Sequence, residues 1–276
     1  MHVSQPIKAI PALPLTSAIE ARLSGSPLVL LLDVDGTLAP IAPRPEYASV
    51  PSDTRQILAD LAATPNVRVV VISGRSADDA RRLVDVPGLW IIGNHGIEVA
   101  APGEAPTARD AVAGYADSIA EAAARATRIA DTLPGVIVEN KRWTLSVHYR
   151  LAHPTVVPSL SARIAEIAKE LGLALTGGKE VLELRPPVEI DKGTAAILVA
   201  EELGALSDGA SIFCAGDDRT DEDMFRAFRS RRPDAVTVWV GPESAVDRTA
   251  AQFHVPDTAA MCELLEAVRD LRRARA

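Results

Sequence analysis

Residues 28–37 read LVLLLDVDGT, five aliphatic residues followed by a polar segment that contains Asp33 and Asp35. A short continuous aliphatic run predicts a strand that is buried on both faces of a sheet. Open α/β folds bind their ligands beyond the carboxyl ends of such strands, which is where this segment lies. Two carboxylates at positions i and i+2 project the same way, Gly36 permits a sharp turn, and Thr37 adds a hydroxyl. One carboxylate can therefore act as a nucleophile and the other as a proton shuttle.

Two simpler interpretations of this segment are less favoured. A polar strand exit with an Asx turn is common around an isolated Asp-Gly pair, but here two aspartates follow five aliphatic residues. A calcium-binding EF-hand loop needs its glycine at position six and a glutamate at position twelve, whereas Gly36 stands at position four. A catalytic pair of carboxylates is the interpretation that we retain.

The rest of the chain alternates short aliphatic runs with helical patterns. This alternation predicts a parallel sheet with helices on both faces, an α/β architecture. The predicted strands are residues 28–32, 67–72, 90–92, 212–215 and 235–240. The predicted helices of this part are residues 52–63, 76–84, 194–203, 221–228 and a closing helix from about residue 259.

The pattern of predicted helices and strands changes between residues 103 and 187. Two helices, over about 109–132 and 158–171, each precede a pair of strands. The first hairpin turns through residues 140–142, and the second is expected to turn at Gly177-Gly178. We therefore expect three parts: an N-terminal extension (1–26), a discontinuous core (27–102 and 188–276) and an inserted α+β domain (103–187).

Composition limits the class of protein. Of 276 residues, 47% are hydrophobic and 24% are charged, which excludes a disordered or collagen-like chain. The net charge of −8 argues against a surface that binds nucleic acid or an anionic membrane, although a local basic pocket stays possible. Two cysteines cannot build a disulfide framework, and neither a membrane span nor a secretory signal is visible. A cytoplasmic location is expected.

A second polar segment, GDDRTDED, occupies residues 216–223 after another aliphatic run. Five carboxylates within seven residues repel one another unless a cation neutralises them, and Mg²⁺ prefers oxygen ligands. An acidic helix N-terminus is the alternative, because carboxylates in a first turn suit the helix dipole. That alternative explains Glu222 and Asp223 better than Asp217 and Asp218. A magnesium site is the preferred interpretation of the latter pair.

Two further polar groups stand at strand or helix ends. Ser73 and Gly74 follow the run 67–72, where a hydroxyl and backbone N–H groups at the start of a helix can bind an anion. Lys192 precedes a predicted helix and can balance the carboxylates and a bound phosphate. Each has a simpler alternative when taken alone, a helix cap for Ser73 and a solvated surface lysine for Lys192.

Together these segments resemble the haloacid dehalogenase superfamily of phosphotransferases. DVDGT is similar to its first motif, Ser73 to its second, Lys192 to its third and the GDD of residues 216–218 to its fourth. The second aspartate resembles the phosphatase branch, and the insert resembles a type-2 cap. The implied fold is a Rossmann-like parallel core with an inserted α+β cap.

The resemblance extends to the trehalose-6-phosphate phosphatases over roughly residues 28–265. The matching segments, in order, are LLLDVDGTLAP, ISGR, GNHG, ENK, VHYR, GKEVLELRP, DKG and GDDRTDEDMF. The resemblance implies that cap residues bind the sugar; without it, they would form an exposed charged hairpin face. These residues are Glu139, Lys141, Arg150, Lys179 and Glu183.

The resemblance also implies a mechanism with Mg²⁺ as cofactor. Asp33 attacks phosphorus, and Asp35 acts as general acid and then general base. The residues implied for phosphate binding are Thr37, Ser73, Gly74 and Lys192. The residues implied for the metal are Asp33, Asp35 (through its carbonyl), Asp217, Asp218 and Asp221.

The expected activity is hydrolysis of trehalose 6-phosphate by a monomer whose partner is a small sugar phosphate, with neither nucleic acid nor membrane. One alternative is a phosphatase for another sugar phosphate, such as sucrose phosphate or a glycosyl-glycerate phosphate. A phospho-aspartate switch or a silent sugar-phosphate sensor is a second alternative. Asp35 and the large insert count against a receiver-type switch.

Overall fold

Strand β2 (Leu28–Leu32) runs through the middle of the larger sheet, and its side chains alternate between two hydrophobic cores. Leu28, Leu30 and Leu32 enter one core, whereas Val29 and Leu31 enter the other. All five are fully buried. The aliphatic run is continuous because both faces of this strand are covered.

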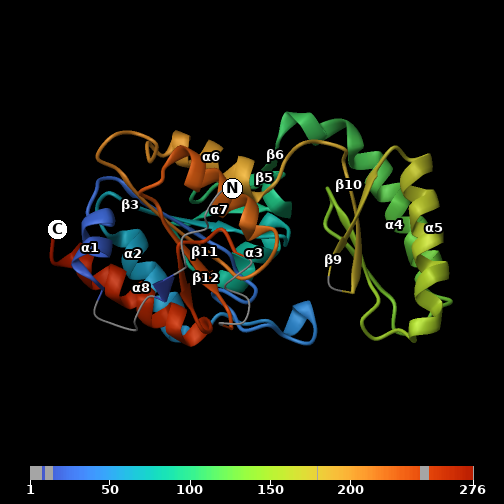
Figure 1. Ribbon diagram of the computed structural model, residues 1–276. Coiled ribbons are helices and arrows are strands. Elements are labelled where there is room, and N and C mark those ends of the chain that lie inside the picture. Colours follow the sequence, from blue (N-terminus) through green and yellow to red (C-terminus); the bar gives the residue numbers. More distant parts are fainter. Residues whose placement is uncertain (1–7, 10–14, 179, 243–248, 276) are drawn as a thin grey trace, which may run out of the picture. The chain divides into compact units, whose positions relative to one another are not determined.

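The sheet around β2 is largely parallel, as predicted (Figure 1). On one side of β2 lies β11, and on the other lies β3; both pair with it in parallel. Near one edge, β5 pairs with β4 in the antiparallel direction. The strand order is β1 (Lys8–Ala9), β13 (Phe253–Val255), β12 (Val236–Val240), β11 (Ser211–Gly216), β2, β3 (Val67–Ile72), β4 (Trp90–Gly93), β5 (Glu98–Ala100) and β6 (Thr107–Ala108).

Helices pack on both faces of this sheet (Figure 1). One face carries α1 (Ser17–Arg22), α2 (Ser52–Ala63), α3 (Ala77–Val84) and α8 (Thr258–Arg273). The other face carries α6 (Lys192–Glu202) and α7 (Asp221–Arg231). Single 3-10 turns lie at η1 (Pro45–Tyr47) and η2 (Asn94–Gly96). The helix α1 buries Ile19 in the same core as β2, so part of the expected N-terminal extension packs with the larger sheet.

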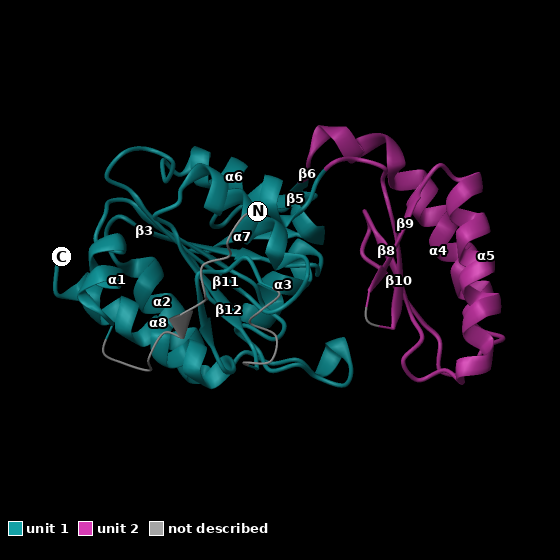
Figure 2. Cartoon of the chain, in the orientation of Figure 1, with its two compact units in different colours: residues 1–107, 190–276 teal, residues 108–189 magenta. Residues whose placement is uncertain are grey.

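The structure, a computed structural model, describes residues 8–9, 15–178, 180–242 and 249–275. The chain divides into two compact units, residues 1–107 with 190–276 and residues 108–189 (Figure 2). Within the described ranges, no helix has the length and apolar character needed to cross a membrane.

The second unit is a small antiparallel sheet backed by two helices (Figure 2). Leu145, Val147 and Leu184 point from the sheet into the core beneath the helices. The strand order is β7 (Ile137–Asn140), β8 (Leu145–His148), β10 (Val181–Arg185) and β9 (Ala174–Gly178). The helices are α4 (Ala116–Ala130) and α5 (Val157–Glu170), preceded by the 3-10 segments η3 (Asp110–Tyr115) and η4 (Pro154–Val156).

Two local predictions in this unit are wrong. Gly177 and Gly178 do not form the turn of the second hairpin but pair with β10 as the end of β9. The chain reverses after them, and Glu180 takes the left-handed conformation with φ of 61°. The helix expected from residue 109 begins at Ala116, because the residues before it form the 3-10 segment η3.

The dependence of the fold on β2 predicts a stability difference between two leucine substitutions. Leu30→Ala removes a fully buried side chain and should lower the free energy of unfolding by about 2–5 kcal/mol. Leu198→Ala, on the outer side of α6, is the control, because its side chain is 48% exposed. Urea unfolding followed by circular dichroism measures both. Equal losses for the two variants would contradict the assignment of β2 to the core.

Candidate active site

Three neighbouring strands of the larger sheet end in polar residues at the same edge. In the order β11-β2-β3, Asp217, Asp33 and Ser73 each come directly after the last strand residue. The chain also brings Lys192 to this edge, at the first position of α6. Residues separated by as many as 184 positions in the sequence therefore meet because the strands are parallel neighbours.

Lys192 holds two aspartates together in the interior. Its side chain is 2% exposed, and its Nζ lies 2.6 Å from Asp33 Oδ1 and 2.8 Å from Asp221 Oδ1. Desolvation lowers the pKa of Lys192, but the charges of Asp221 and Asp33 outweigh it and raise this pKa well above its usual value. The lysine therefore remains an ammonium group between two carboxylates.

The start of α6 fixes the backbone of Lys192. Asp191 is the N-cap: its carboxylate accepts a hydrogen bond of 2.7 Å from Thr194 N–H. In return, Thr194 Oγ1 accepts a bond of 3.0 Å from Asp191 N–H, which completes a capping box. This arrangement stabilises the first turn of the helix, where the lysine side chain leaves the backbone.

The loop after β11 is organised by its own carboxylates. Asp221 Oδ2 accepts hydrogen bonds from the backbone N–H groups of Asp217 (3.0 Å) and Asp218 (3.1 Å). Asp218 Oδ1 accepts bonds from Thr220 N–H (2.7 Å) and Thr220 Oγ1 (2.6 Å). The fully buried Asp221 thus links the loop to Lys192, and Asp218 stabilises the turn that leads into α7.

The pKa values show where negative charge accumulates. Desolvation raises the pKa of Asp33 to about 7, against the lowering effect of Lys192. Desolvation and the charges of Asp221 and Asp218 raise the pKa of Asp217 to about 8. For Asp218 desolvation also acts upward, but Lys192 and hydrogen bonds from Thr220 lower its pKa to about 2. Desolvation also raises the pKa of Asp221 well above its usual value, against the lowering effect of Lys192. The excess of carboxylates is therefore greatest around Asp33, Asp217 and Asp221.

The donor set fits a hard divalent cation. Among the described residues, Asp33, Asp217 and Asp221 offer carboxylate oxygens that all lie within 4.8 Å of one another. Gly36 packs closely against Asp217, since a Cβ on Gly36 would lie 2.1 Å from Asp217 Oδ2. Oxygen ligands of this kind are those that Mg²⁺ uses in proteins. The carboxylate groups of Asp35 and Asp218 do not belong to this set, and they contact Arg75 and Thr220.

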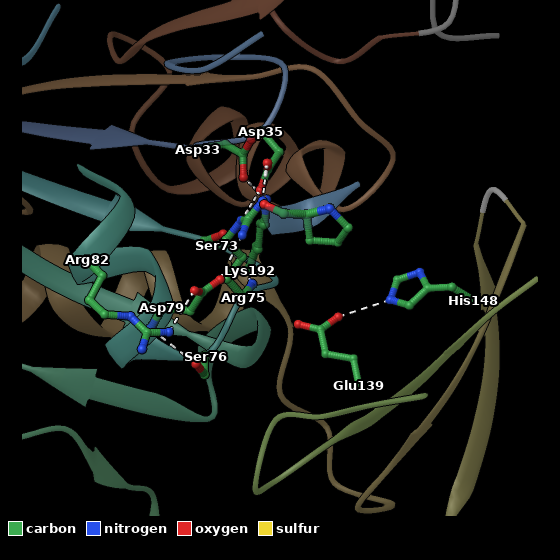
Figure 3. Close-up of polar contacts among 11 residues, drawn as sticks. Asp33, Asp35, Ser73, Arg75, Ser76, Asp79, Arg82, Glu139, His148 and Lys192 are labelled. Carbon is green, nitrogen blue, oxygen red and sulfur yellow. Dashed lines mark hydrogen bonds and ion pairs between the residues drawn. The ribbon is translucent and has the colours of Figure 1, made fainter. Parts of the chain in front are cut away.

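Asp35 is held by Arg75, which is not among the site residues expected from the sequence (Figure 3). Arg75 donates from Nε to Asp35 Oδ2 at 2.6 Å and from Nη2 to Asp35 Oδ1 at 2.8 Å. Burial lowers the pKa of Arg75, but its bonds to Asp35 and Asp79 raise it above the usual value. The available signal was the position of Arg75 within ISGR, two residues after Ser73.

The residues expected to bind phosphate lie around this edge. Ser73 is buried, and its Oγ accepts a bond of 3.2 Å from Arg75 N–H. Gly74 lies against the ring of His95, since a Cβ there would come within 2.5 Å of His95 Cε1. Thr37 is fully buried, and its Oγ1 has no hydrogen-bond partner among the described residues. A hydroxyl buried in this way is suited to a ligand oxygen.

The residues expected to bind a sugar lie in the second unit. Two of them, Lys141 and Glu183, form an ion pair at 3.7 Å. Glu139 lies 3.0 Å from His148 Nε2 (Figure 3), a histidine that belongs to the VHYR segment but was not singled out by the sequence. Arg150 pairs with Glu180 at 2.9 Å, and Lys179 lies outside the described residues. In the sheet, Glu139 on β7 and Glu183 on β10 both lie opposite Ser146 on β8, so the three residues form one row across the strands.

Known proteins are similar to this chain in sequence and in architecture. The family model described as trehalose-phosphatase matches residues 31–259. A trehalose-phosphate phosphatase from Mycobacterium avium is 36% identical over 250 residues, which cover 90% of this chain and 63% of that protein. An uncharacterized glycosyl hydrolase from Mycobacterium tuberculosis is 36% identical over 97% of this chain, but the match covers 20% of that protein. This chain thus spans from a fifth to about two thirds of these relatives.

Solved structures with names of the same kind are similar to this chain in fold. A crystal structure titled as a trehalose-6-phosphate phosphatase related protein has a TM-score of 0.78 and 27% identity, covering 90% of this chain and all of that one. The C-terminal domain of the Candida albicans trehalose-6-phosphate phosphatase shares the fold, with a TM-score of 0.77 and 23% identity over 96% of this chain and 99% of that one. The family match over most of the chain decides the assignment: this chain belongs to the trehalose-phosphatase family.

Proposed function

We propose that this chain hydrolyses trehalose 6-phosphate to trehalose and phosphate through a phosphorylated aspartate. The observation that carries the proposal is the buried Asp33, which Lys192 holds at the carboxyl end of β2 in a member of this family. Relatives that cover most of the chain bear the name trehalose-phosphate phosphatase.

Asp33 is the proposed nucleophile. Lys192 binds its Oδ1, so Oδ2 is the oxygen to which we assign the attack on phosphorus. As the bond from Asp33 to phosphorus forms, the bond from phosphorus to the sugar oxygen breaks, and Asp35 gives that oxygen a proton. Water then attacks the phosphorus of the aspartyl-phosphate, Asp35 accepts its proton, and phosphate leaves with Asp33 regenerated.

The phosphoryl oxygens are assigned to donors around the same edge. These are the Ser73 and Thr37 hydroxyls, the Gly74 N–H and the Lys192 ammonium. Fixed donors in a buried site stabilise the charge that develops on phosphoryl oxygens without reorganisation of solvent. The buried Thr37 hydroxyl described above supports its place in this set.

A divalent cation, which we propose to be Mg²⁺, is assigned to the acidic residues. Asp33, the Asp35 carbonyl and Asp217 would hold it, with Asp218 and Asp221 fixing the loop that presents Asp217. When bound, such an ion neutralises charge on the carboxylates and on the phosphoryl group. Asp33 and Asp217, which belong to the group of three carboxylates whose oxygens lie within 4.8 Å of one another, support this assignment.

The second unit is the proposed cap that recognises the sugar. We assign Glu139, Lys141, Arg150, Lys179 and Glu183 to its hydroxyls, since carboxylates and ammonium groups are strong partners for hydroxyls. We also propose a monomer in the cytoplasm; the free thiols of Cys214 and Cys262 are consistent with a reducing compartment.

A panel of phosphate esters tests the substrate. With Mg²⁺, kcat/KM for trehalose 6-phosphate should exceed that for sucrose 6-phosphate, glucose 6-phosphate and a glucosyl-glycerate phosphate by at least tenfold. EDTA should abolish phosphate release, and added Mg²⁺ should restore it. If trehalose 6-phosphate were turned over no better than the other esters, the substrate assignment would be wrong. A rate of phosphate release unaffected by EDTA would contradict the assignment of a metal.

Replacing the buried lysine tests the nucleophile's environment. Lys192→Met leaves two buried carboxylates without their ammonium partner and should reduce kcat by about 10²-fold or more. Lys169→Met, at an exposed position of α5, is the matched control and should keep the original rate. Phosphate release and circular dichroism are measured on both. A Lys192 variant that is folded and retains kcat within threefold would contradict the role of this residue.

Gly36 offers a test of the metal site. A Cβ on Gly36 would overlap Asp217 Oδ2, so Gly36→Ala should raise the Mg²⁺ concentration for half-maximal activity by about tenfold. Gly103→Ala is the control for backbone strain: Gly103 also has a positive φ, of 80°, and its Cβ would meet no atom within 4 Å. An equal change in both variants would show that strain, and not the contact with Asp217, is responsible.

A further inference from the structure

Arg75 grips the carboxylate of Asp35 with two parallel hydrogen bonds, at 2.6 Å and 2.8 Å (Figure 3). Such a bidentate pair fixes the plane and the direction of a carboxylate, which a single contact from a lysine does not. Lys192, by contrast, contacts Asp33 and Asp221. The two aspartates of DVDGT therefore have different cationic partners.

Arg75 is itself held from a second direction. Its Nη1 lies 2.7 Å from Asp79 Oδ2, one turn along α3. The N-cap Ser76 accepts a hydrogen bond from Asp79 N–H at 3.2 Å, and Arg82 pairs with Asp79 Oδ1 at 3.0 Å. The Arg75 side chain is 10% exposed, so few other orientations are open to it.

A third contact reaches the segment after DVDGT. Arg75 Nη2 donates to the carbonyl of Pro45 at 3.1 Å, at the start of η1. Arg75 thus connects the end of β2, the start of α3 and the turn η1 through one guanidinium group. Its contacts with Asp79 and with the Pro45 carbonyl hold the guanidinium group that binds Asp35, and none of the contacts described for it involves Asp33.

We propose that Arg75 is the positioning residue of the acid–base step, and that it aims the Asp35 carboxyl group at the oxygen of the departing sugar. The proposal rests on the proposed function and deepens it, because it assigns the direction of proton transfer to a residue outside the DVDGT segment. During transfer, the proton passes from Asp35 to the sugar oxygen as its bond to phosphorus breaks. Arg75 neither gives nor takes a proton.

A role in proton transfer has a specific kinetic signature. The sugar leaves as an alkoxide unless it is protonated, whereas p-nitrophenolate is a stable anion that needs no proton. The value of kcat/KM covers events up to the first irreversible step, the departure of the leaving group. Misplacing Asp35 should therefore reduce kcat/KM for the sugar phosphate far more than for p-nitrophenyl phosphate.

The experiment compares Arg75→Gln with the original enzyme on both esters. We expect kcat/KM for trehalose 6-phosphate to fall by about 10²-fold, since general acid catalysis contributes roughly 10²–10⁴-fold. For p-nitrophenyl phosphate the loss should stay below about tenfold. Arg81→Gln is the matched control and should behave as the original, because Arg81 lies on α3, the helix that follows Arg75, and donates to the Glu104 carbonyl. Equal losses on both esters would overturn the proposal, because they would indicate a direct contact of Arg75 with the phosphoryl group.

Two additional variants make the result independent of folding defects. Asp79→Asn loosens Arg75 without altering Asp35 and should show the same bias between the two esters, with a smaller loss. In the double variant Arg75→Gln/Asp35→Asn, kcat/KM for the sugar phosphate should fall less than threefold below that of Asp35→Asn alone, because residues that act as a unit are not additive. Multiplicative losses would overturn the proposal.

Failure of the role proposed for Arg75 and failure of the proposed substrate give different results. If the original enzyme released no phosphate from trehalose 6-phosphate but did so from another sugar phosphate, the proposed substrate would be wrong. The comparison of Arg75→Gln would then be made with that ester against p-nitrophenyl phosphate. The expected bias between a sugar and a nitrophenolate leaving group would be the same.

Discussion

The buried ammonium group of Lys192 is the interaction on which the arrangement of the site depends. It joins the end of β2, the start of α6 and the start of α7 through Asp33 and Asp221. Transfer of these charges from water is costly, and the cost is met only because each carboxylate has a close partner. Asp221 in turn holds the backbone of residues 217 and 218, so the acidic loop is organised by the same contact.

Two cationic side chains bind the two aspartates of the DVDGT segment separately. Lys192 contacts Asp33, and Arg75 contacts Asp35, although the aspartates are only two residues apart. Neighbouring carboxyl groups in different environments can serve as nucleophile and as proton shuttle. Asp33 also belongs to the group of three carboxylates, with Asp217 and Asp221, whose oxygens lie within 4.8 Å of one another.

The sequence predicts the architecture well because its signals are local. Continuous aliphatic runs identify β2 and β3 with the bounds that the structure shows, and the helical pattern over residues 52–63 identifies α2. Adjacent parallel strands then explain why Asp33, Ser73 and Asp217 share an edge. The grip of Arg75 on Asp35 is not predictable in this way, since it depends on the orientation of two side chains 40 residues apart. The hairpin near residue 178 also differs from expectation, because pairing with β10 outweighs the turn preference of two glycines.

The central claim is that Asp33, held by Lys192, carries the phosphoryl group during turnover. The most direct measurement is rapid acid quenching of the enzyme with ³²P-labelled trehalose 6-phosphate, followed by peptide mapping. The account predicts a transient, hydroxylamine-sensitive label on the peptide that contains Asp33, and no label in Asp33→Asn. Label on a different residue, or phosphate release by Asp33→Asn at the original rate, would contradict it.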